Sequence, residues 1–166
     1  MSWYGASQVI SPPAYSDAVC FEQAYNHKPV YGAGEYWVVR PLDVYGQSDE
    51  QAVQVNGNFS IYPWQSNAGA YNHNFAFAIV DKTPSQFAIT VNNPYLPPDP
   101  AHIVNCPDMY IYQYAVNSAG YNQLNNDIHT SRDAVIKLRA EGKIAKYLAA
   151  CTFVLLEPTI PALCDT

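Results

Sequence analysis

The sequence predicts a mainly β protein: a single sandwich- or barrel-like antiparallel domain of about six to eight strands, with one C-terminal α-helix and extended terminal arms. Two hairpin patterns and one long alternating strand pattern support this fold class. The length of 166 residues is typical of one domain, and 49% hydrophobic residues argue against disorder. The predicted division is an N-terminal arm (1–30), a β core (31–128), a helix (129–150) and a terminal strand with a tail (151–166).

The clearest hairpin pattern is Asn74–Tyr95. Its strands, FAFAIV at 75–80 and QFAITV at 86–91, alternate bulky and smaller side chains, and the polar link between them contains a proline. Successive strand side chains point to opposite faces, so each strand has one bulky face. The side chains predicted on the bulky faces are Phe75, Phe77, Ile79, Phe87, Ile89 and Val91, and those expected in the core are Phe75, Phe77, Phe87 and Ile89.

A second hairpin pattern, Gln51–Tyr62, contains the strong turn signal Asn56-Gly57. A two-residue loop would divide its apolar side chains between two faces, whereas a three-residue loop makes one face wholly apolar. Because strand register follows the buried face, we predict the longer loop, with Asn58 in the left-handed region that asparagine tolerates. The predicted cross-strand pairs are Val55 with Phe59 and Val53 with Ile61.

The N-terminal part of the chain is predicted as irregular. The segment Met1–Val30 reads as an arm that wraps a neighbour or packs on the surface, and a short helix around Ala14–Tyr25, capped by Ser16, fits within it. Glu35–Val39 (EYWVV) is a predicted strand with both faces covered, ended by Pro41.

The stretch 92–107 contains five prolines and is predicted as a stiff connector, which crosses the end of the sandwich or presents Tyr95 and Leu96 for docking. The strand that follows, Asp108–Val116, carries a tyrosine stripe on one face, which is either a contact surface for sugars or proteins or a sheet face under a loop. This stripe consists of Tyr110, Tyr112 and Tyr114.

The C-terminal part is predicted as loop, helix and strand. The Asn-rich segment Asn117–His129 reads as a loop. Ser131–Glu141 is the best helix, capped by Thr130 or Ser131, and ended by Gly142 unless it continues through Lys143–Leu148. The side chains expected to face inward are Val135, Leu138 and Ala134, and Cys151–Leu156 is a predicted buried strand before Pro158.

Charge and composition exclude some partners. Only 13% of residues are charged, the net charge is −6, and residues 1–128 hold ten acids against three bases, so a phosphate-binding surface there is not credible. No apolar run is long enough to span a membrane, and the N-terminus lacks the pattern of a signal peptide. We therefore predict no nucleic acid and no membrane as partners, and a location in a virion, or in the cytoplasm before assembly.

The residues that carry chemistry form no recognisable motif. The four cysteines lack a CxxC pair, so disulfides with three connectivities or free thiols both remain open. No nucleotide-binding, metal-ligand or nucleophile signature is present, and no cofactor is predicted. Folding could bring His73 and His102 together, and the loop carboxylates are acid–base candidates. These groups are Cys20, Cys106, Cys151 and Cys164; His27, His73, His102 and His129; and Glu35, Asp43, Asp49 and Glu50.

Three functions follow as hypotheses. The first is a non-enzymatic structural protein that acts through contacts with other subunits, such as a capsid decoration, cement or tail protein of a virion, because a weakly charged surface rich in Tyr, Asn and Pro suits stable contacts. The second is a domain that binds a glycan or a small ligand, and the third is a small enzyme with a His/carboxylate site. The predicted binding residues are Trp37, Trp64, Tyr95, Leu96, Tyr110, Tyr112 and Tyr114.

Overall fold

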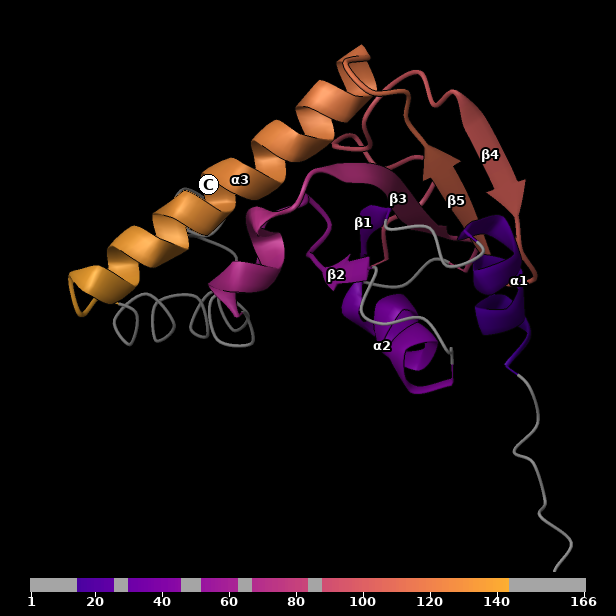
Figure 1. Ribbon diagram of the computed structural model, residues 1–166, viewed down its shortest axis with the longest axis horizontal. Coiled ribbons are helices and arrows are strands. Elements are labelled where there is room, and N and C mark those ends of the chain that lie inside the picture. The colour runs from indigo at the N-terminus through magenta and orange to yellow at the C-terminus, as the bar shows by residue number, and fades with distance from the viewer. Residues whose placement is uncertain (1–14, 26–29, 46–51, 63–66, 84–87, 144–166) are drawn as a thin grey trace, which may run out of the picture.

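The fold is an open mixed sheet covered by helices on both faces (Figure 1). It comes from a computed structural model, which describes residues 15–25, 30–45, 52–62, 67–83 and 88–143. Within these residues the chain forms three α-helices, one 3₁₀ helix and a single five-stranded sheet. The predicted mainly β sandwich or barrel is therefore wrong, because the sheet contains parallel pairs and its covering layers are helical.

The sheet has the order β2-β1-β3-β5-β4. The strand β1 pairs in parallel with β2 and β3, whereas β5 pairs antiparallel with β3 and β4. Parallel neighbours cannot be joined by a tight hairpin, so the chain crosses from β1 to β2 through a helix. The strands are β1 (Tyr31–Gly34), β2 (Ala52–Gln54), β3 (Phe75–Asp81), β4 (His102–Asn105) and β5 (Met109–Gln113).

Two hydrophobic cores lie on opposite faces of this sheet. Helices α1 (Ser16–Tyr25) and α2 (Tyr36–Tyr45) cover one face, and α3 (Ala119–Ala140) covers the other together with the 3₁₀ helix η1 (Ala68–Asn72). No helix in the described ranges is long and apolar enough to span a membrane. The core under α1 and α2 includes Phe21, Tyr25, Val39, Leu42, Phe77, Ile79, Met109 and Ile111, and the core under α3 includes Val55, Phe59, Ile61, Phe75, Val80, Ile89, Leu124 and Ile128.

The central strand β3 corrects the predicted hairpin at Asn74–Tyr95. It pairs with β1 and β5, and residues 88–90 return to it only at its end, where Asp81 and Ile89 bond and Thr90 forms one parallel bridge. A register shift also separates Phe75 from Phe77, so these rings enter opposite cores and not one shared face. The expected burial of Phe75, Phe77 and Ile89 is confirmed, and Phe87 lies outside the described residues.

The expected strand Glu35–Val39 is wrong, because residues 36–45 form α2. The carboxylate of Glu35 accepts a hydrogen bond from the backbone nitrogen of Trp37 at 2.7 Å, as a helix N-terminus favours. The inward pair Val39 and Leu42 is buried against the sheet. Tertiary packing thus holds a helix that contains Pro41, although proline removes one backbone donor.

The hairpin predicted at Gln51–Tyr62 has a different turn in the structure. The strand β2 pairs in parallel with β1, and beyond it Val55 bridges Ile61 instead of Phe59, so the loop is longer than three residues. The residue with positive φ is Phe59, at 61°, and not Asn58. The expectation of one apolar cluster nevertheless holds, since Val53, Val55, Phe59 and Ile61 all join the core under α3.

Helix α3 begins at Ala119, so the predicted loop Asn117–His129 is wrong. Ser118, and not Thr130 or Ser131, caps the helix by accepting a bond from the backbone nitrogen of Tyr121 at 3.2 Å. The buried Asn125 explains the difference: its amide accepts from the Phe75 nitrogen at 2.8 Å and donates to the Phe75 carbonyl at 2.9 Å. An asparagine that sequence reasoning assigned to a loop thus joins α3 to β3.

The C-terminal end of α3 agrees with the prediction in part. Val135 is buried and Gly142, with φ of 65°, follows the helix, whereas Ala134 is exposed and Leu138 is half-buried. Glycine adopts this left-handed conformation without steric cost. The predicted strand Cys151–Leu156 and both terminal tails lie outside the described residues.

A disulfide joins Cys20 of α1 to Cys106, the residue after β4. It settles one of the pairings that the sequence left open, while Cys151 and Cys164 lie outside the described residues. The helix α1 falls in the segment predicted as an N-terminal arm, and it packs Ala18, Phe21 and Tyr25 into the core. The bridge therefore links a core-forming helix to the end of the edge strand β4, on the same face of the sheet.

Candidate functional site

The predicted binding residues do not gather at one place. Trp37 lies on α2, on one side of the sheet, whereas the other described candidates lie on the side covered by α3. Trp64 lies outside the described residues. The candidates on the α3 side are Tyr95, Leu96, Tyr110, Tyr112 and Tyr114.

The tyrosine stripe of β5 is largely part of the structure's interior. Tyr114 is buried and donates its hydroxyl proton to the carbonyl of Pro97 at 2.9 Å, while Tyr110 and Tyr112 are half-buried against the core under α3. The ammonium of Lys82 lies 4.7 Å from the centre of the Tyr110 ring. The stripe thus corresponds to the sheet face under a loop, with the proline-rich connector lying on Tyr114.

The connector exposes one of its two predicted docking residues. Tyr95 has an exposed fraction of 50%, and its carbonyl accepts from the amide of Gln123 on α3 at 3.3 Å. Leu96 is half-buried against the core. Tyr95 therefore presents an exposed ring on the α3 side of the sheet.

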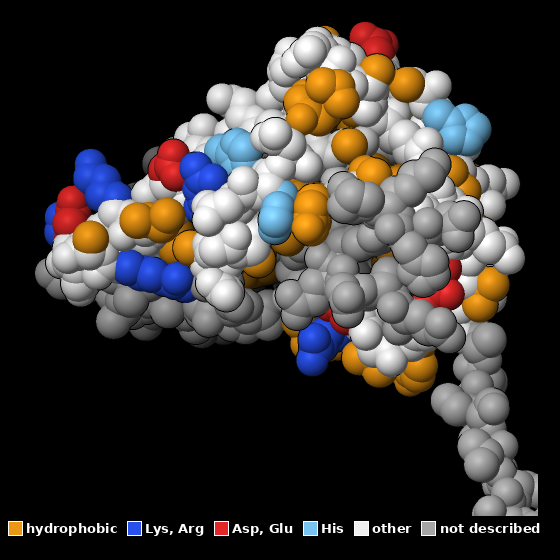
Figure 2. Space-filling view, viewed as in Figure 1, with side chains coloured by type: hydrophobic (Ala, Val, Ile, Leu, Met, Phe, Trp, Pro, Cys, Tyr) orange, Lys and Arg blue, Asp and Glu red, His pale blue; other side chains and the backbone are white. Residues whose placement is uncertain are grey.

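The outer face of α2 is the candidate contact surface. Its exposed residues fall at helical spacing, with Trp37 exposed by 69% and Val44 by 59%, one turn on either side of Arg40. Figure 2 shows hydrophobic side chains beside basic ones where Figure 1 places α2. We define the α2 face as Tyr36, Trp37, Arg40, Val44 and Tyr45.

The aromatic groups of the α2 face contact neighbouring rings. The rings of Tyr36 and Trp37 pack edge to face at 4.9 Å, and the Tyr45 ring lies 5.7 Å from that of Tyr15. Arg40 lies 3.9 Å from the carboxylate of Asp43, so the two charges of this helix largely balance each other. The α2 face is therefore apolar and nearly neutral. Glu35 at the start of the helix, and the buried Val39 and Leu42 beneath it, hold the helix in place.

Two carboxyl groups sit at the carboxyl ends of the parallel strands β1 and β3. Glu35 follows β1 with only 3% of its surface exposed, and Asp81 ends β3. Burial and the nearby charge of Glu35 raise the pKa of Asp81 to about 6, although its carboxylate accepts a bond from the Ile89 nitrogen at 3.1 Å. Burial also raises the pKa of Glu35, and burial with the Glu35 charge raises the pKa of Tyr62 to about 12.

Replacing Asp81 with asparagine should stabilise the protein at neutral pH. Because the folded state raises this pKa from 3.8 to about 6, folding favours the protonated acid, and stability falls as pH rises from about 4 to 7. Asparagine keeps a carbonyl oxygen for the Ile89 nitrogen and carries no charge. Asp81 remains partly in contact with water, which screens its charge. We therefore expect Asp81→Asn to gain only about 1 kcal/mol in the free energy of unfolding at pH 7.5 and little at pH 4.

Urea unfolding across this pH range tests that expectation. The matched control is Asp99→Asn, the same change at an exposed position whose backbone conformation asparagine also adopts. Equal pH profiles for the wild type and Asp81→Asn would show that Asp81 is not desolvated.

The described histidines do not meet these carboxyl groups. His73 stacks on Tyr31 at 3.7 Å, and its carbonyl accepts from Nε2 of His129 at 2.9 Å, before the start of β3. Asp81 is at the other end of that strand, roughly 20–25 Å away at ~3.3 Å per residue. His73 and His102 are not brought together either, since β5 separates β4 from β3. His27 lies outside the described residues.

The described candidates for a catalytic or metal centre lie apart from one another or have structural partners. Among the described residues, no group of three or more His, Cys, Asp or Glu side chains could hold a metal ion. Of the proposed acid–base carboxylates, Glu35 binds the start of α2 and Asp43 lies beside Arg40. Asp49 and Glu50 lie outside the described residues.

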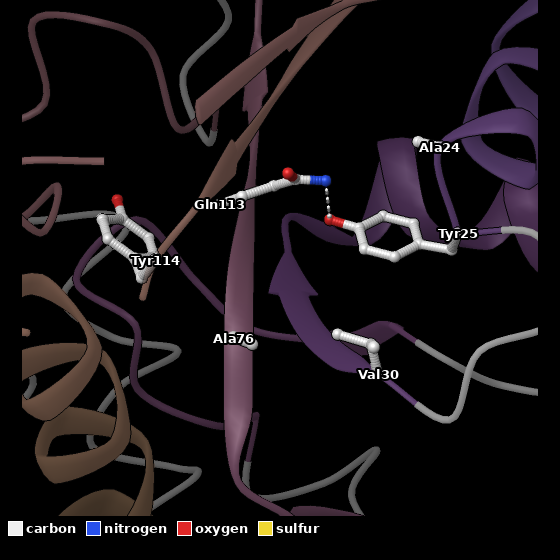
Figure 3. A pocket seen from close by; sticks show the side chains of 6 residues that line it. All are labelled: Ala24, Tyr25, Val30, Ala76, Gln113 and Tyr114. Carbon is white, nitrogen blue, oxygen red and sulfur yellow. Dashed lines mark hydrogen bonds between the residues drawn. The ribbon is translucent and has the colours of Figure 1, made fainter. Parts of the chain in front are cut away.

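A cavity of about 270 Å³ opens between α1 and the end of the sheet (Figure 3). Its polar groups come from Tyr25 and Gln113, whose amide donates to the Tyr25 hydroxyl at 3.2 Å. Sequence reasoning missed this cavity, because its two main polar groups come from residues 88 apart in the chain. The one local signal was Gln113, a long polar side chain between two tyrosines of the predicted strand.

Comparisons of the chain with known protein families, with curated proteins and with solved structures found no match.

Proposed function

We propose that the protein is a non-enzymatic assembly protein that acts through protein–protein contacts, and that it is a component of a virus particle, such as a capsid decoration, cement or tail protein. The observation that supports this most directly is the α2 face. A Trp side chain exposed by 69%, next to an arginine and further exposed apolar residues, has the composition found at the energetic centres of interfaces.

The α2 face is well suited to bind an apolar, uncharged partner surface. Val39 and Leu42 are buried under the helix, so Trp37 and Val44 are presented on an anchored element. Interface side chains that are already ordered lose less entropy on binding. Since Arg40 already lies near Asp43, a partner would have to desolvate little unbalanced charge.

Two features support the narrower proposal of a virus particle. The chain has 13% charged residues with 14 Tyr and 13 Pro, a composition that suits extensive permanent contacts. The disulfide between Cys20 and Cys106 suits a protein that must persist in an oxidising environment, as a released particle does.

Replacing Trp37 with alanine should weaken assembly at least tenfold without unfolding the protein. A central aromatic anchor contributes about 2 kcal/mol or more to binding, and about 1.4 kcal/mol is a factor of ten. Sedimentation velocity over a wide concentration range measures self-association, and gradient fractionation of particles from the virus or organism that encodes the chain measures incorporation. The wild type should form oligomers or migrate with the particles.

Tyr95→Ala is the matched control, because it removes an exposed aromatic ring from the other side of the sheet. It should assemble like the wild type. A wild type that stays monomeric and binds no particle would contradict the proposed function. Equal losses in Trp37→Ala and Tyr95→Ala would contradict the assignment of the contact to the α2 face.

A further inference from the structure

We propose that the cavity beside Tyr25 and Gln113 is a binding site for a compact, uncharged and mainly apolar molecule that carries one hydroxyl or carbonyl group. The site is independent of the α2 face. Its lining residues are Ala24, Tyr25, Val30, Ala76, Gln113 and Tyr114.

Small side chains at the wall create the space. Ala24 comes from α1 and Ala76 from β3, and both line the cavity where larger residues would fill it (Figure 3). An engineered cavity of about 150 Å³ binds benzene, so a volume of about 270 Å³ admits a molecule of roughly ten non-hydrogen atoms. The cavity is therefore large enough for one or two small rings.

The polar groups define the chemistry of the ligand. In Figure 3 the phenol of Tyr25 and the amide of Gln113 point toward each other, and the amide donates to the hydroxyl oxygen. Within the described part of the chain, no further hydrogen bond involves the Tyr25 hydroxyl proton or the Gln113 side-chain oxygen. The cavity thus offers one donor and one acceptor at adjacent atoms, enough for a single hydroxyl or carbonyl group.

The lining residues also exclude charged ligands and ligands with many hydroxyl groups. None of the six lining side chains carries a charge, and Tyr25 stays protonated because burial raises its pKa, so an ion would find no counter-charge there. Tyr114 donates to Pro97, which leaves few partners for a sugar with many hydroxyl groups. A phenol or an indole matches the site in size and in hydrogen bonding.

Titration of the oxidised, full-length protein with phenol or indole tests this site. Saturable shifts of the Gln113 side-chain amide and the Ala76 backbone amide are expected in ¹⁵N-correlated spectra, together with a thermal midpoint that rises with ligand concentration. Benzoate and methyl glucoside, the charged and polyhydroxyl probes, should produce neither effect.

A variant whose cavity is filled by a larger side chain is the decisive test of this site. Ala24→Leu inserts a larger side chain from a helical position and should weaken phenol binding at least tenfold, while Ala134→Leu, the same change at an exposed position of α3, should bind like the wild type. If Ala24→Leu fails to fold, Ala76→Val narrows the cavity from the sheet and carries the same expectation. Absence of saturable shifts in the wild type, or equal affinity in the filled and control variants, would overturn the proposal. Neither result depends on assembly through the α2 face.

Discussion

Replacing Phe77 with alanine should lower the free energy of unfolding by about 3–5 kcal/mol, the range typical of a large buried aromatic residue. Phe77 is fully buried in the central strand, and its ring stacks on Tyr25 at 4.5 Å and meets Phe21 edge-on at 5.6 Å. It also fills the space over Gly32, where a β-carbon would lie 2.1 Å from the ring. Because the ring is enclosed from α1 and β1, the surroundings cannot easily collapse into the hole.

Equilibrium unfolding in urea measures this loss. The matched control is again Tyr95→Ala, which truncates a ring with half its surface exposed and should cost less than about 1 kcal/mol. A loss of similar size in both variants would show that Phe77 is not at the centre of the packed sheet.

Removing the disulfide between Cys20 and Cys106 should cost about 2–5 kcal/mol. The bridge spans a sequence separation of 86 residues, and in the chain-entropy model a loop of that length restricts the unfolded state by about 4–5 kcal/mol. The folded state does not depend on the bridge alone, because α1 also packs Phe21 into the core and Asp17 accepts from the Asp108 nitrogen at 3.1 Å. We therefore expect a destabilised variant that still folds.

The design uses Cys20→Ala, Cys106→Ala and the double variant. If the bridge is the cause, all three lose nearly the same free energy of unfolding, since either single change already breaks it. Losses that simply add would indicate two independent packing defects and no bond between these residues. Non-reducing peptide mapping of the wild type should recover the linked pair directly.

Sequence reasoning succeeded where burial alone decides. The alternation of Asp108–Val116 correctly predicted β5, with Met109 and Ile111 facing one core and the tyrosine stripe the other. It also placed Phe75, Phe77 and Ile89 in the interior. These predictions hold because an apolar side chain gains free energy from leaving water whichever partner covers it.

It failed where an element depends on distant partners. The run Tyr-Trp-Val-Val at 36–39 fits a helix or a strand equally well, and the choice depends on Glu35 binding the helix start and on a sheet to cover Val39. The Asn-rich start of α3 reads as a loop because asparagine often bonds to its local backbone, yet Asn125 bonds to β3, 50 residues away. These two errors are the reason that the sequence predicts a sandwich and not an α/β fold.

The candidate functional surfaces were likewise predicted only in part from the sequence. The sequence identified Trp37 as a binding residue by its type, but the structure placed it on an exposed helix face, away from the other described candidates. The cavity and the Glu35–Asp81 pair had no sequence signal that joined their members, since they arise from strands that are distant along the chain.

The sequence by itself determined that Phe75, Phe77 and Ile89 avoid water and where β5 runs. Only the tertiary structure decided the direction and order of the strands, the helical state of 36–45 and 119–130, and the pairing of Cys20 with Cys106. The physical reason is that hydrophobic burial is non-directional and depends only on each residue's own side chain. Strand pairing and buried hydrogen bonds instead require a particular partner that the fold brings near.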